Sequence, residues 1–593
     1  MTNYDITLDS RGYMLAPGTY RRGLDAAGGV GGPPVRQVQR EWAGGVGRAI
    51  QGERDRFWQS RGLLPVGRGE GPGPGPRETT FTIAGLAPLK RRHGVIAGGR
   101  PYLATGGSLW RPERGVAGTY PNNLAGLSQL GATLPQEITG LATDGADRLF
   151  LSRAGAGYAV WPLGGGPFDL TATVQLVGCA WYAGSLWGGV LDPVGWRLAR
   201  VTAPNAIEGI GWPLDRAPRA FATVRDGLYI GTGGGLWRVR GAVVGGAFSG
   251  EIAPLASGGG GADDFCALAE FGGDLYTWAG GEVVRYHVTA SGGATLLPAG
   301  RRGWACRGLA TAGGWLFAAL VDGPDSADVA LWAYDGAGWW CVARDLDGEH
   351  DYSWPTPTAS YFDNADLLAW GLGLARCHAF QLRPRAGQPG LAPDGELTTS
   401  LWHGRDPDAA KGWTRIGAEL AWPGGATFSP CAATLAWSTD GATFTPLAST
   451  VLADATPRSL VADLPPGTVG KWLALRYTIT GVTDGAPTLA ALWAEYRPLE
   501  TPRRRRHWAF TILAADELLD RAGRPDPRGG TQIAADLRAA WVSGATLPFR
   551  DLDDPLDPTE RAVRIVALDE AIAAPADAGR WTESRIAVRL VEV

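Results

Sequence analysis

Short segments of alternating apolar and polar residues recur from residue 79 to residue 392, and glycine-rich turns separate them. Residues 226–238 (DGLYIGTGGGLWR), 100–111 (RPYLATGGSLWR) and 273–285 (GDLYTWAGGEVVR) share this pattern. An alternating strand, a glycine-rich turn and a second strand that begins with bulky residues are typical of a β-hairpin. The pattern therefore predicts a repeated β-hairpin unit.

The repeat has a nearly constant period. Its anchor residues lie about 44 residues apart on average, the length of a four-stranded propeller blade. A second apolar strand rich in small residues precedes each anchor, as in residues 137–143 and 266–271, and suits a crowded central axis. The spacing predicts a seven-bladed β-propeller over residues 79–392, with six or eight blades left open and a β-sandwich as the alternative. The anchors are Tyr102, Phe150, Trp187, Tyr229, Tyr276, Phe317 and Leu368.

Residues 393–499 contain apolar strands with no helical period. The strands are expected at residues 413–420, 433–438, 472–479 and 489–496. Asp440 and Gly441 supply the residue pair that a tight hairpin turn favours. This segment predicts a jelly-roll-like β-sandwich.

Residues 500–593 change character and predict a small α+β domain. Residues 531–541 place apolar side chains at helical spacing, with Thr531 as the expected N-cap. Because a strand that ends a chain is usually tied into a sheet, the last strand should be paired. The expected strands are residues 507–513, 547–551, 562–568 and 586–593.

Residues 1–78 lack such regularity and predict an extended N-terminal arm. The run Gly-Pro-Gly-Pro-Gly-Pro at residues 71–76 is typical of a linker. An arm with scattered aromatic residues cannot bury a core by itself. We therefore expect it to lie along a neighbour, either in the same chain or in another copy.

Composition supports many short strands and excludes several classes of protein. The chain has 593 residues, with 89 Gly, 42 Pro and 26 Trp, and a net charge of −4. Turns use Gly and Pro, while Trp fills wide cores between sheets. The weak net charge predicts no nucleic-acid partner. No secretion signal and no apolar run long enough for a membrane span are present, so assembly in a host cytoplasm is expected.

Motifs for catalysis or metal binding are not found in the sequence. The six cysteines form no CxxC pair and predict buried free thiols, and the six histidines form no HExxH motif. No GxSxG or GxxxxGK[ST] motif occurs. We therefore predict no enzymatic activity, no catalytic, cofactor-binding or metal-binding residues, and no cofactor. The acidic run from Asp345 to Asp351 is expected to be a solvated loop, with a calcium site as the alternative.

Two polar segments have an ordinary structural interpretation. Residues 438–444 (STDGATF) are similar to the Asp-box hairpin of sialidases, in which the carboxylate accepts hydrogen bonds from turn amides. Residues 503–506 are four arginines at a predicted domain boundary, expected to contact an acidic neighbour or solvent.

Three groups of segments together resemble tail-associated virion proteins of tailed bacteriophages. Residues 41–47 with 55–62 look like the arm of such proteins, and residues 548–553, 563–565 and 588–593 look like their small C-terminal module. Residues 438–444, 471–477 and 486–489 look like their sandwich. The resemblance implies a non-enzymatic structural role in a virion, with other virion proteins and copies of the chain as partners.

The resemblance leaves the position in the particle open. A tail tip, fibre or baseplate role is expected, with host adhesion through exposed Trp and Tyr of the propeller loops as a further step. A glycan-binding or glycan-cleaving propeller is one alternative, a host scaffold protein is another, and a capsid or neck appendage is a third. Copy number, symmetry and receptor are not determined by the sequence.

Overall fold

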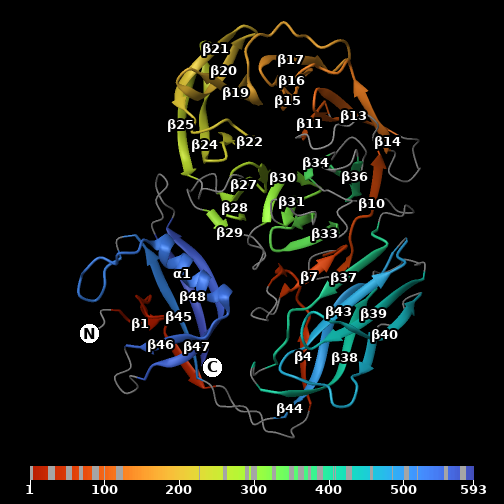
Figure 1. The fold of residues 1–593 in the computed structure, drawn as a ribbon, viewed down its shortest axis with the longest axis vertical. Helices are drawn as coiled ribbons and strands as arrows, with labels where there is room; N and C mark the ends of the chain where they lie inside the picture. Colours follow the sequence, from red (N-terminus) through yellow and green to blue (C-terminus); the bar gives the residue numbers. More distant parts are fainter. Residues whose placement is uncertain are drawn as a thin grey trace.

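A computed structural model shows a mainly β chain with one α-helix among the described residues (Figure 1). No helix in that part of the chain has the length and apolar character needed to cross a membrane. The structure describes residues 4–24, 34–47, 56–65, 71–82, 92–98, 100–114, 124–225, 227–257, 264–286, 293–295, 304–322, 329–345, 353–357, 366–370, 376–382, 391–404, 407, 409–422, 430–453, 459–483, 485–499, 506–516, 518–552, 559–574 and 583–592.

Antiparallel sheets of three or four consecutive strands follow one another through the first two-thirds of the chain. The first sheet contains β11 (Arg92–Ala97), β12 (Arg100–Thr105), β13 (Ser108–Arg114) and β14 (Leu124–Leu130). The second contains β15 (Ile138–Thr143), β16 (Arg148–Arg153) and β17 (Ala156–Pro162). The third contains β18 (Val177–Tyr182), β19 (Ser185–Asp192), β20 (Gly195–Ala203) and β21 (Ala206–Pro213). The fourth contains β22 (Ala220–Val224), β23 (Gly227–Gly231), β24 (Gly235–Val244) and β25 (Ala247–Ser257). The fifth contains β26 (Leu268–Phe271), β27 (Asp274–Ala279), β28 (Glu282–Tyr286) and β29 (Gly293–Thr295). The sixth contains β30 (Trp304–Ala312), β31 (Trp315–Asp322), β32 (Val329–Tyr334) and β33 (Trp339–Asp345).

A further sheet joins segments from both ends of this region. It has the order β34 (Ser353–Pro357), β35 (Asp366–Trp370), β36 (Arg376–Gln381) and β10 (Glu78–Thr82). Strand β10 therefore precedes the first sheet in sequence but pairs with the last one. The first strands of successive sheets contact each other in order, and β34 contacts β11. The sheets form a radial, propeller-like array (Figure 1).

The predicted anchors lie on the second strand of each sheet. Tyr102, Phe150, Trp187, Tyr229, Tyr276 and Phe317 are all buried, and Trp187 and Phe317 have no exposed surface. Leu368 lies on β35, where the side chain is outside the described residues. Large side chains on this strand fill the space between neighbouring sheets, which is why the sequence repeats them. The second sheet has three strands, and its fourth position is occupied by an irregular segment that bridges at Asp169 and Gln175.

Two sheets that share one core follow the propeller-like array. One has the order β40 (Thr445–Leu452), β39 (Cys431–Ser438), β43 (Ala474–Thr480), β37 (Asp394–Thr398) and β7 (Gln59–Arg61). The other has β4 (Val35–Gln39), β44 (Thr488–Pro498), β38 (Lys411–Ala421) and β41 (Ser459–Asp463), with β42 (Val469–Gly470) also beside β38. The four strands expected from the sequence coincide with β38, β39, β43 and β44. Trp413, Leu435, Tyr477 and Leu492 from these strands are all buried in the shared core.

The C-terminal part is one sheet with a helix on one face. The sheet has the order β2 (Arg11–Tyr13), β1 (Ile6–Leu8), β46 (Leu547–Asp551), β47 (Arg561–Ala574), β48 (Glu583–Glu592), β45 (Arg506–Ala515) and β3 (Arg21–Leu24). Helix α1 (Gly530–Ser543) buries Ile533 and Leu537 against it. The last strand, β48, is paired on both sides, as expected from the sequence.

The expected helix cap at Thr531 is wrong. Helix α1 begins at Gly530, and its N-cap is Gly529, which has no side chain that could accept a hydrogen bond. Asp516, directly after β45, accepts the Gly530 N–H at 2.8 Å instead. A carboxylate that is distant in sequence thus replaces the local cap, and local sequence rules do not reveal such a partner.

The N-terminal segment lies along the same chain and completes sheets in each part of it. Strands β1, β2 and β3 extend the C-terminal sheet. Strand β7 forms one edge of the central sheet that contains β37, and β4 forms one edge of the central sheet that contains β44. Strand β5 (Gly45–Val46) pairs with β33 in parallel, and β6 (Arg56–Phe57) pairs with β5. In Figure 1 these red segments lie beside green, cyan and blue strands.

The Gly-Pro run is a buried strand rather than an exposed linker. Strand β9 (Pro72–Pro74) pairs with β8 (Leu63–Pro65), and residues 71–76 are all buried. A Cβ atom at Gly71 would lie 1.8 Å from the Leu489 carbonyl oxygen. The composition of this run is typical of a linker. Because glycine has no side chain, the same run can also pack closely against another backbone.

Candidate functional site

The described residues contain no group of three or more His, Cys, Asp or Glu side chains close enough to share a metal ion. The acidic run at residues 345–351 cannot be compared with its calcium alternative, because residues 346–352 and the Asp345 side chain lie outside those residues. For the same reason, Arg503, Arg504 and Arg505 have no structural account. The backbone N–H of Arg506 donates to the Glu592 carboxylate at 3.2 Å.

The cysteines that the structure describes are free thiols. Cys179, Cys306, Cys341 and Cys431 are buried, and Cys266 is half-buried. Burial raises the pKa of the Cys179 thiol to about 11, so the nucleophilic thiolate does not form at neutral pH. Four of the five described thiols are thus buried and free, as the sequence predicted, and Cys266 is only half-buried. Cys377 lies on β36, where its side chain is outside the described residues.

The Asp440 turn is held by its own carboxylate. Asp440 Oδ1 accepts hydrogen bonds from the Ser438 hydroxyl at 2.6 Å and from the Ala442 and Thr443 N–H groups at 2.8 and 2.9 Å. The Ser438 hydrogen bond, followed by those of the two amides, lowers the pKa of Asp440 to about 2. Asp440 therefore has the turn-stabilising role that the sequence predicted for its hairpin.

No tryptophan side chain that the structure describes is among its large exposed hydrophobic residues. Trp187, Trp332, Trp340 and Trp402 are fully buried, and Tyr20 is the aromatic residue among the large exposed hydrophobic side chains of the described residues. Tyr20 belongs to the C-terminal sheet region and not to the propeller-like array. The expectation of exposed Trp and Tyr in propeller loops therefore gains no support from the part of the chain that the structure describes.

A junction joins the last propeller-like sheet, the N-terminal segment and the central sheets. His378 on β36 is fully buried, and its Nδ1 lies 2.7 Å from Glu78 Oε1 on β10. Beside this pair, Arg61 on β7 forms an ion pair with Asp394 on β37 at 3.2 Å. A cavity of about 320 Å³ beside them is lined by Glu78, Arg61, Asp394 and Arg344, among other residues. Two cationic and two acidic side chains line the cavity, so its charges are balanced.

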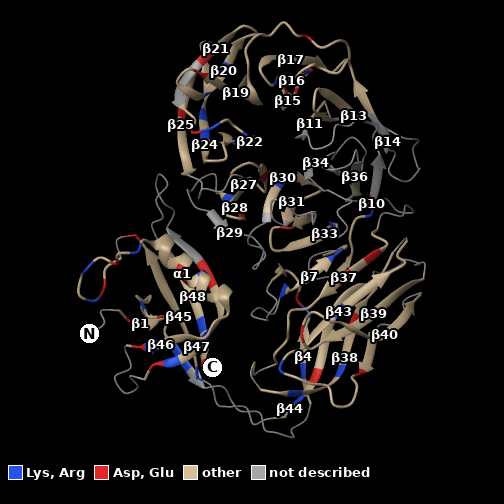
Figure 2. Cartoon of the chain, in the orientation of Figure 1, with Lys and Arg blue, Asp and Glu red and all other residues tan. Residues whose placement is uncertain are grey.

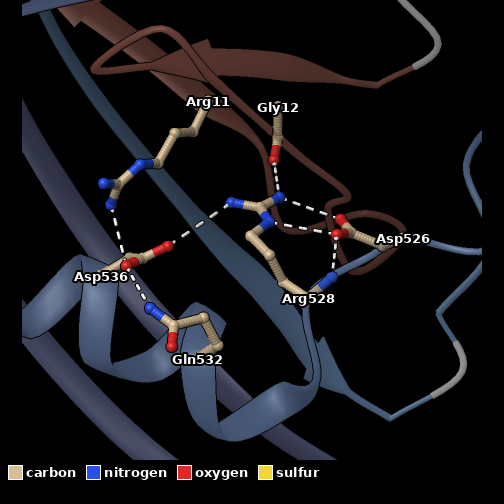
Figure 3. Close-up of polar contacts among 6 residues, drawn as sticks. All are labelled: Arg11, Gly12, Asp526, Arg528, Gln532 and Asp536. Atoms are coloured by element: carbon tan, nitrogen blue, oxygen red, sulfur yellow. Dashed lines mark hydrogen bonds and ion pairs between the residues drawn. The ribbon is translucent and has the colours of Figure 1, made fainter.

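A second polar cluster fastens the N-terminal hairpin to the C-terminal helix (Figure 3). Arg528 donates from Nε and Nη2 to the two oxygens of Asp526, at 3.1 and 2.9 Å. The same Nη2 donates to the Gly12 carbonyl, and the guanidinium lies 5.0 Å from the centre of the Tyr13 ring. One side chain therefore contacts the loop before α1 and the hairpin of β1 and β2. We call this group, with Asp536, the Arg528 cluster.

Electrostatics favour the charged forms of Asp526 and Arg528, the central pair of the Arg528 cluster. Burial raises the pKa of Asp526, but the hydrogen bonds and the charge of Arg528 outweigh it, so the pKa is lowered overall. Asp536 on α1 forms an ion pair with Arg11 on β2 at 2.9 Å and accepts from Gln532 at 2.8 Å. Bidentate arginine–carboxylate pairs are strong and directional. The cluster therefore fixes the position of the N-terminal hairpin.

Sequence reasoning did not single out the Arg528 cluster. Arg528 and Asp526 lie in a loop without apolar periodicity, and their partners Gly12 and Tyr13 are more than 500 residues away. Neither motif nor spacing connects such distant segments. Only the pairing of β1 with β46 brings them together.

The sheets define a mainly β protein with a propeller-like array. No family model and no curated protein matches the chain. Among solved structures, a mitotic checkpoint complex is similar with 11% identity and a TM-score of 0.38, over 54% of this chain and 95% of that one. YCF48 bound to D1 peptide has 11% identity and a TM-score of 0.37, over 52% and 99%.

The WD40 β-propeller domain of Doa1 has 10% identity and a TM-score of 0.35, over 51% of this chain and 95% of that one. At such TM-scores these likenesses carry no argument about function.

Proposed function

We propose that the chain is a non-enzymatic structural component of a bacteriophage particle, associated with the tail. In this proposal, the propeller-like array is a seven-bladed β-propeller whose ring is closed by β10. The two central sheets are a jelly-roll-like sandwich, and the C-terminal sheet is an attachment module. Other virion proteins and further copies of the chain are its partners.

The main support is the way in which the N-terminal segment runs through the molecule. It contributes strands to the C-terminal sheet, to both central sheets and to the sheets of β33 and β36. Each added strand joins parts that would otherwise be connected only in sequence. A chain built in this way resists mechanical separation of its parts, which is useful in a particle that transmits force.

Some of the segments that resemble tail-associated proteins lie at these joining points. Residues 41–47 and 55–62 contain β5, β6 and β7, which pair with the propeller-like array and the central sheets. Residues 548–553 and 588–593 overlap β46 and β48 in the C-terminal sheet. The resemblance therefore includes several of the elements that hold the parts together.

Particle composition tests the proposal. Phage particles are purified by density gradient from a lysed culture that encodes the chain, and its peptides are quantified by mass spectrometry against the major tail protein. We expect co-sedimentation at a fixed copy number, and labelled antibodies should mark the tail. A chain found only in the free soluble fraction would contradict the proposal. Glycan cleavage by the purified chain would contradict the non-enzymatic part.

A further inference from the structure

One face of the C-terminal sheet is covered by α1, and the opposite face is not covered by any described element. Trp508, Phe510 and Val588 lie on the covered face and are buried. Residues that alternate with them lie on the other face, because successive side chains of a strand point to opposite sides. We call this the open face. Its residues include Thr7, Arg21, His507, Ala509, Thr511, Leu513, Arg550, Arg564, Ala567, Asp569, Arg585, Ala587, Arg589 and Val591.

The open face is strongly basic. Five arginines from four strands lie on it, against one aspartate among its described side chains, Asp569. Residues 506–593 as a whole contain eleven arginines and fifteen acidic residues. The open face is therefore basic although residues 506–593 are net acidic. Basic stretches on the strands of this sheet are visible in Figure 2.

Three of these arginines, Arg550, Arg564 and Arg589, are available to a partner. Arg550 and Arg589 are exposed in the complete chain, and neither forms an ion pair within the described residues. Arg564 is half-buried, and its Nε is buried with no hydrogen-bond partner among the described residues. A buried guanidinium N–H without a partner is unfavourable, so an acceptor from outside would stabilise it.

Small and aliphatic side chains separate the arginines. Ala509, Ala567 and Ala587 lie between the arginines, and their short side chains rise little above the sheet. Leu513 and Val591 on the same face are half-buried. Arginines interleaved with apolar positions are typical of protein interfaces. No Trp, Tyr or Phe lies on the open face within the described residues, so stacking on nucleic-acid bases has no platform there.

We propose that the open face is a docking surface for an acidic strand or helix of another protein. Carboxylates of the partner would pair with Arg550, Arg564 and Arg589, and its apolar side chains would contact Leu513 and Val591. A second copy presenting the same face would place arginine against arginine, which is repulsive. This proposal does not depend on the phage assignment, because it follows from the charge and burial of the sheet alone.

Binding of a labelled polyglutamate peptide of about 20 residues to the full-length chain tests the charge complementarity. Fluorescence anisotropy at low ionic strength gives the dissociation constant. We expect the double variant Arg550→Gln/Arg589→Gln to bind about tenfold more weakly, since exposed ion pairs contribute modestly but additively. The matched control Arg148→Gln/Arg197→Gln removes two arginines from the propeller-like array and should change binding less than about twofold.

Three outcomes would overturn the proposal. The first is equal weakening in the open-face and control variants, which would show unspecific attraction. The second is unchanged binding in the open-face variant when its thermal unfolding matches that of the wild type. The third is tighter binding of a duplex DNA of about 20 base pairs that is also lost in the open-face variant, which would assign the face to nucleic acid.

Discussion

At the residue scale, carboxylates organise several turns of this chain by accepting backbone N–H groups. Asp144 accepts from residues 146, 147 and 148, and Asp335 accepts from residues 337 and 338. Asp440 uses the same geometry. The sequence indicates this role at Asp440 only, because there the surrounding residues match a known hairpin pattern.

Replacing Asp440 with alanine should destabilise the central sheets in a pH-dependent way. The folded state holds the pKa of Asp440 at about 2, below the ordinary value of 3.8, so its contribution is present above about pH 4. That contribution is lost as the pH falls through about 2. Scanning calorimetry should therefore show a lower transition temperature for Asp440→Ala at pH 6 and a smaller difference at pH 2.

Asp440→Asn is the matched control, because its amide oxygen can still accept the turn N–H groups. It should retain most of the stability at pH 6 and show little pH dependence. An equal difference between the wild type and Asp440→Ala at both pH values would contradict the role given to the carboxylate.

Replacing Arg528 with alanine should release the N-terminal hairpin. The Asp526 side chain is almost fully buried, with 1% exposed, and would lose its bidentate partner. Breaking such a pair costs about 3 kcal/mol of unfolding free energy in the C-terminal sheet. Hydrogen exchange should become faster in residues 5–13, and denaturant unfolding of this sheet should shift to lower concentration.

Arg528→Lys keeps the charge but not the planar fork and should give an intermediate effect. Arg524→Ala, in the same loop but with a largely exposed side chain, is the control and should change little. If Arg524→Ala and Arg528→Ala accelerate exchange equally, the Arg528 cluster has no special role.

At the element scale, the glycine-rich turns have a second function beyond forming hairpins. A Cβ atom at Gly107 would lie 2.0 Å from the Leu134 carbonyl oxygen, and one at Gly231 would lie 1.8 Å from that of Phe265. Leu134 and Phe265 both precede the first strand of the next sheet. At these turns, the backbone of one sheet therefore packs directly against the backbone that leads into the next sheet.

Gly231→Ala should separate two neighbouring sheets of the propeller-like array. The added methyl group cannot fit without moving the backbone at Phe265, and such overpacking costs about 1–3 kcal/mol. Gly164→Ala is the control, because no atom lies within 4 Å of the added Cβ and the backbone is unstrained. Thermal unfolding of both variants checks this. Equal stability of the two variants would contradict the close approach at Phe265.

At the scale of the whole molecule, the two ends of the chain share one sheet. Strands β1, β2 and β3 flank the C-terminal strands, and Ile6, Leu8 and Tyr13 are buried in their core. The C-terminal sheet therefore lacks part of its core until the N-terminal residues pair with it. The chain is closed by non-covalent pairing between its ends.

Removing residues 1–24 should leave the C-terminal sheet partly unfolded and sensitive to proteases. The truncated chain loses the edge strands beside β46 and β45 and exposes the apolar side chains that they cover. A synthetic peptide of residues 1–24, added in trans, should restore protease resistance in residues 506–592. A peptide with Ile6 and Leu8 replaced by Asp is the control, and rescue by both peptides would contradict specific pairing.

Much of the local structure follows from the sequence itself. The period of the hairpin repeat, the burial of its anchors and the strands of the central and C-terminal sheets all appear in the order of apolar residues. Examples are the strands at Trp413 and Leu435 and the helix around Leu537. In each, the spacing of apolar residues shows which face is buried.

The tertiary structure alone decided which distant segments pair. The Gly-Pro run is buried against Leu489, β1 pairs with β46, and Asp516 rather than Thr531 accepts at the start of α1. The periodicity of apolar residues shows which face of a strand or helix is buried. It does not show which other strand pairs with the edge of that strand. Edge pairing and distant polar contacts depend on backbone groups that every residue shares, so only the folded chain determines them.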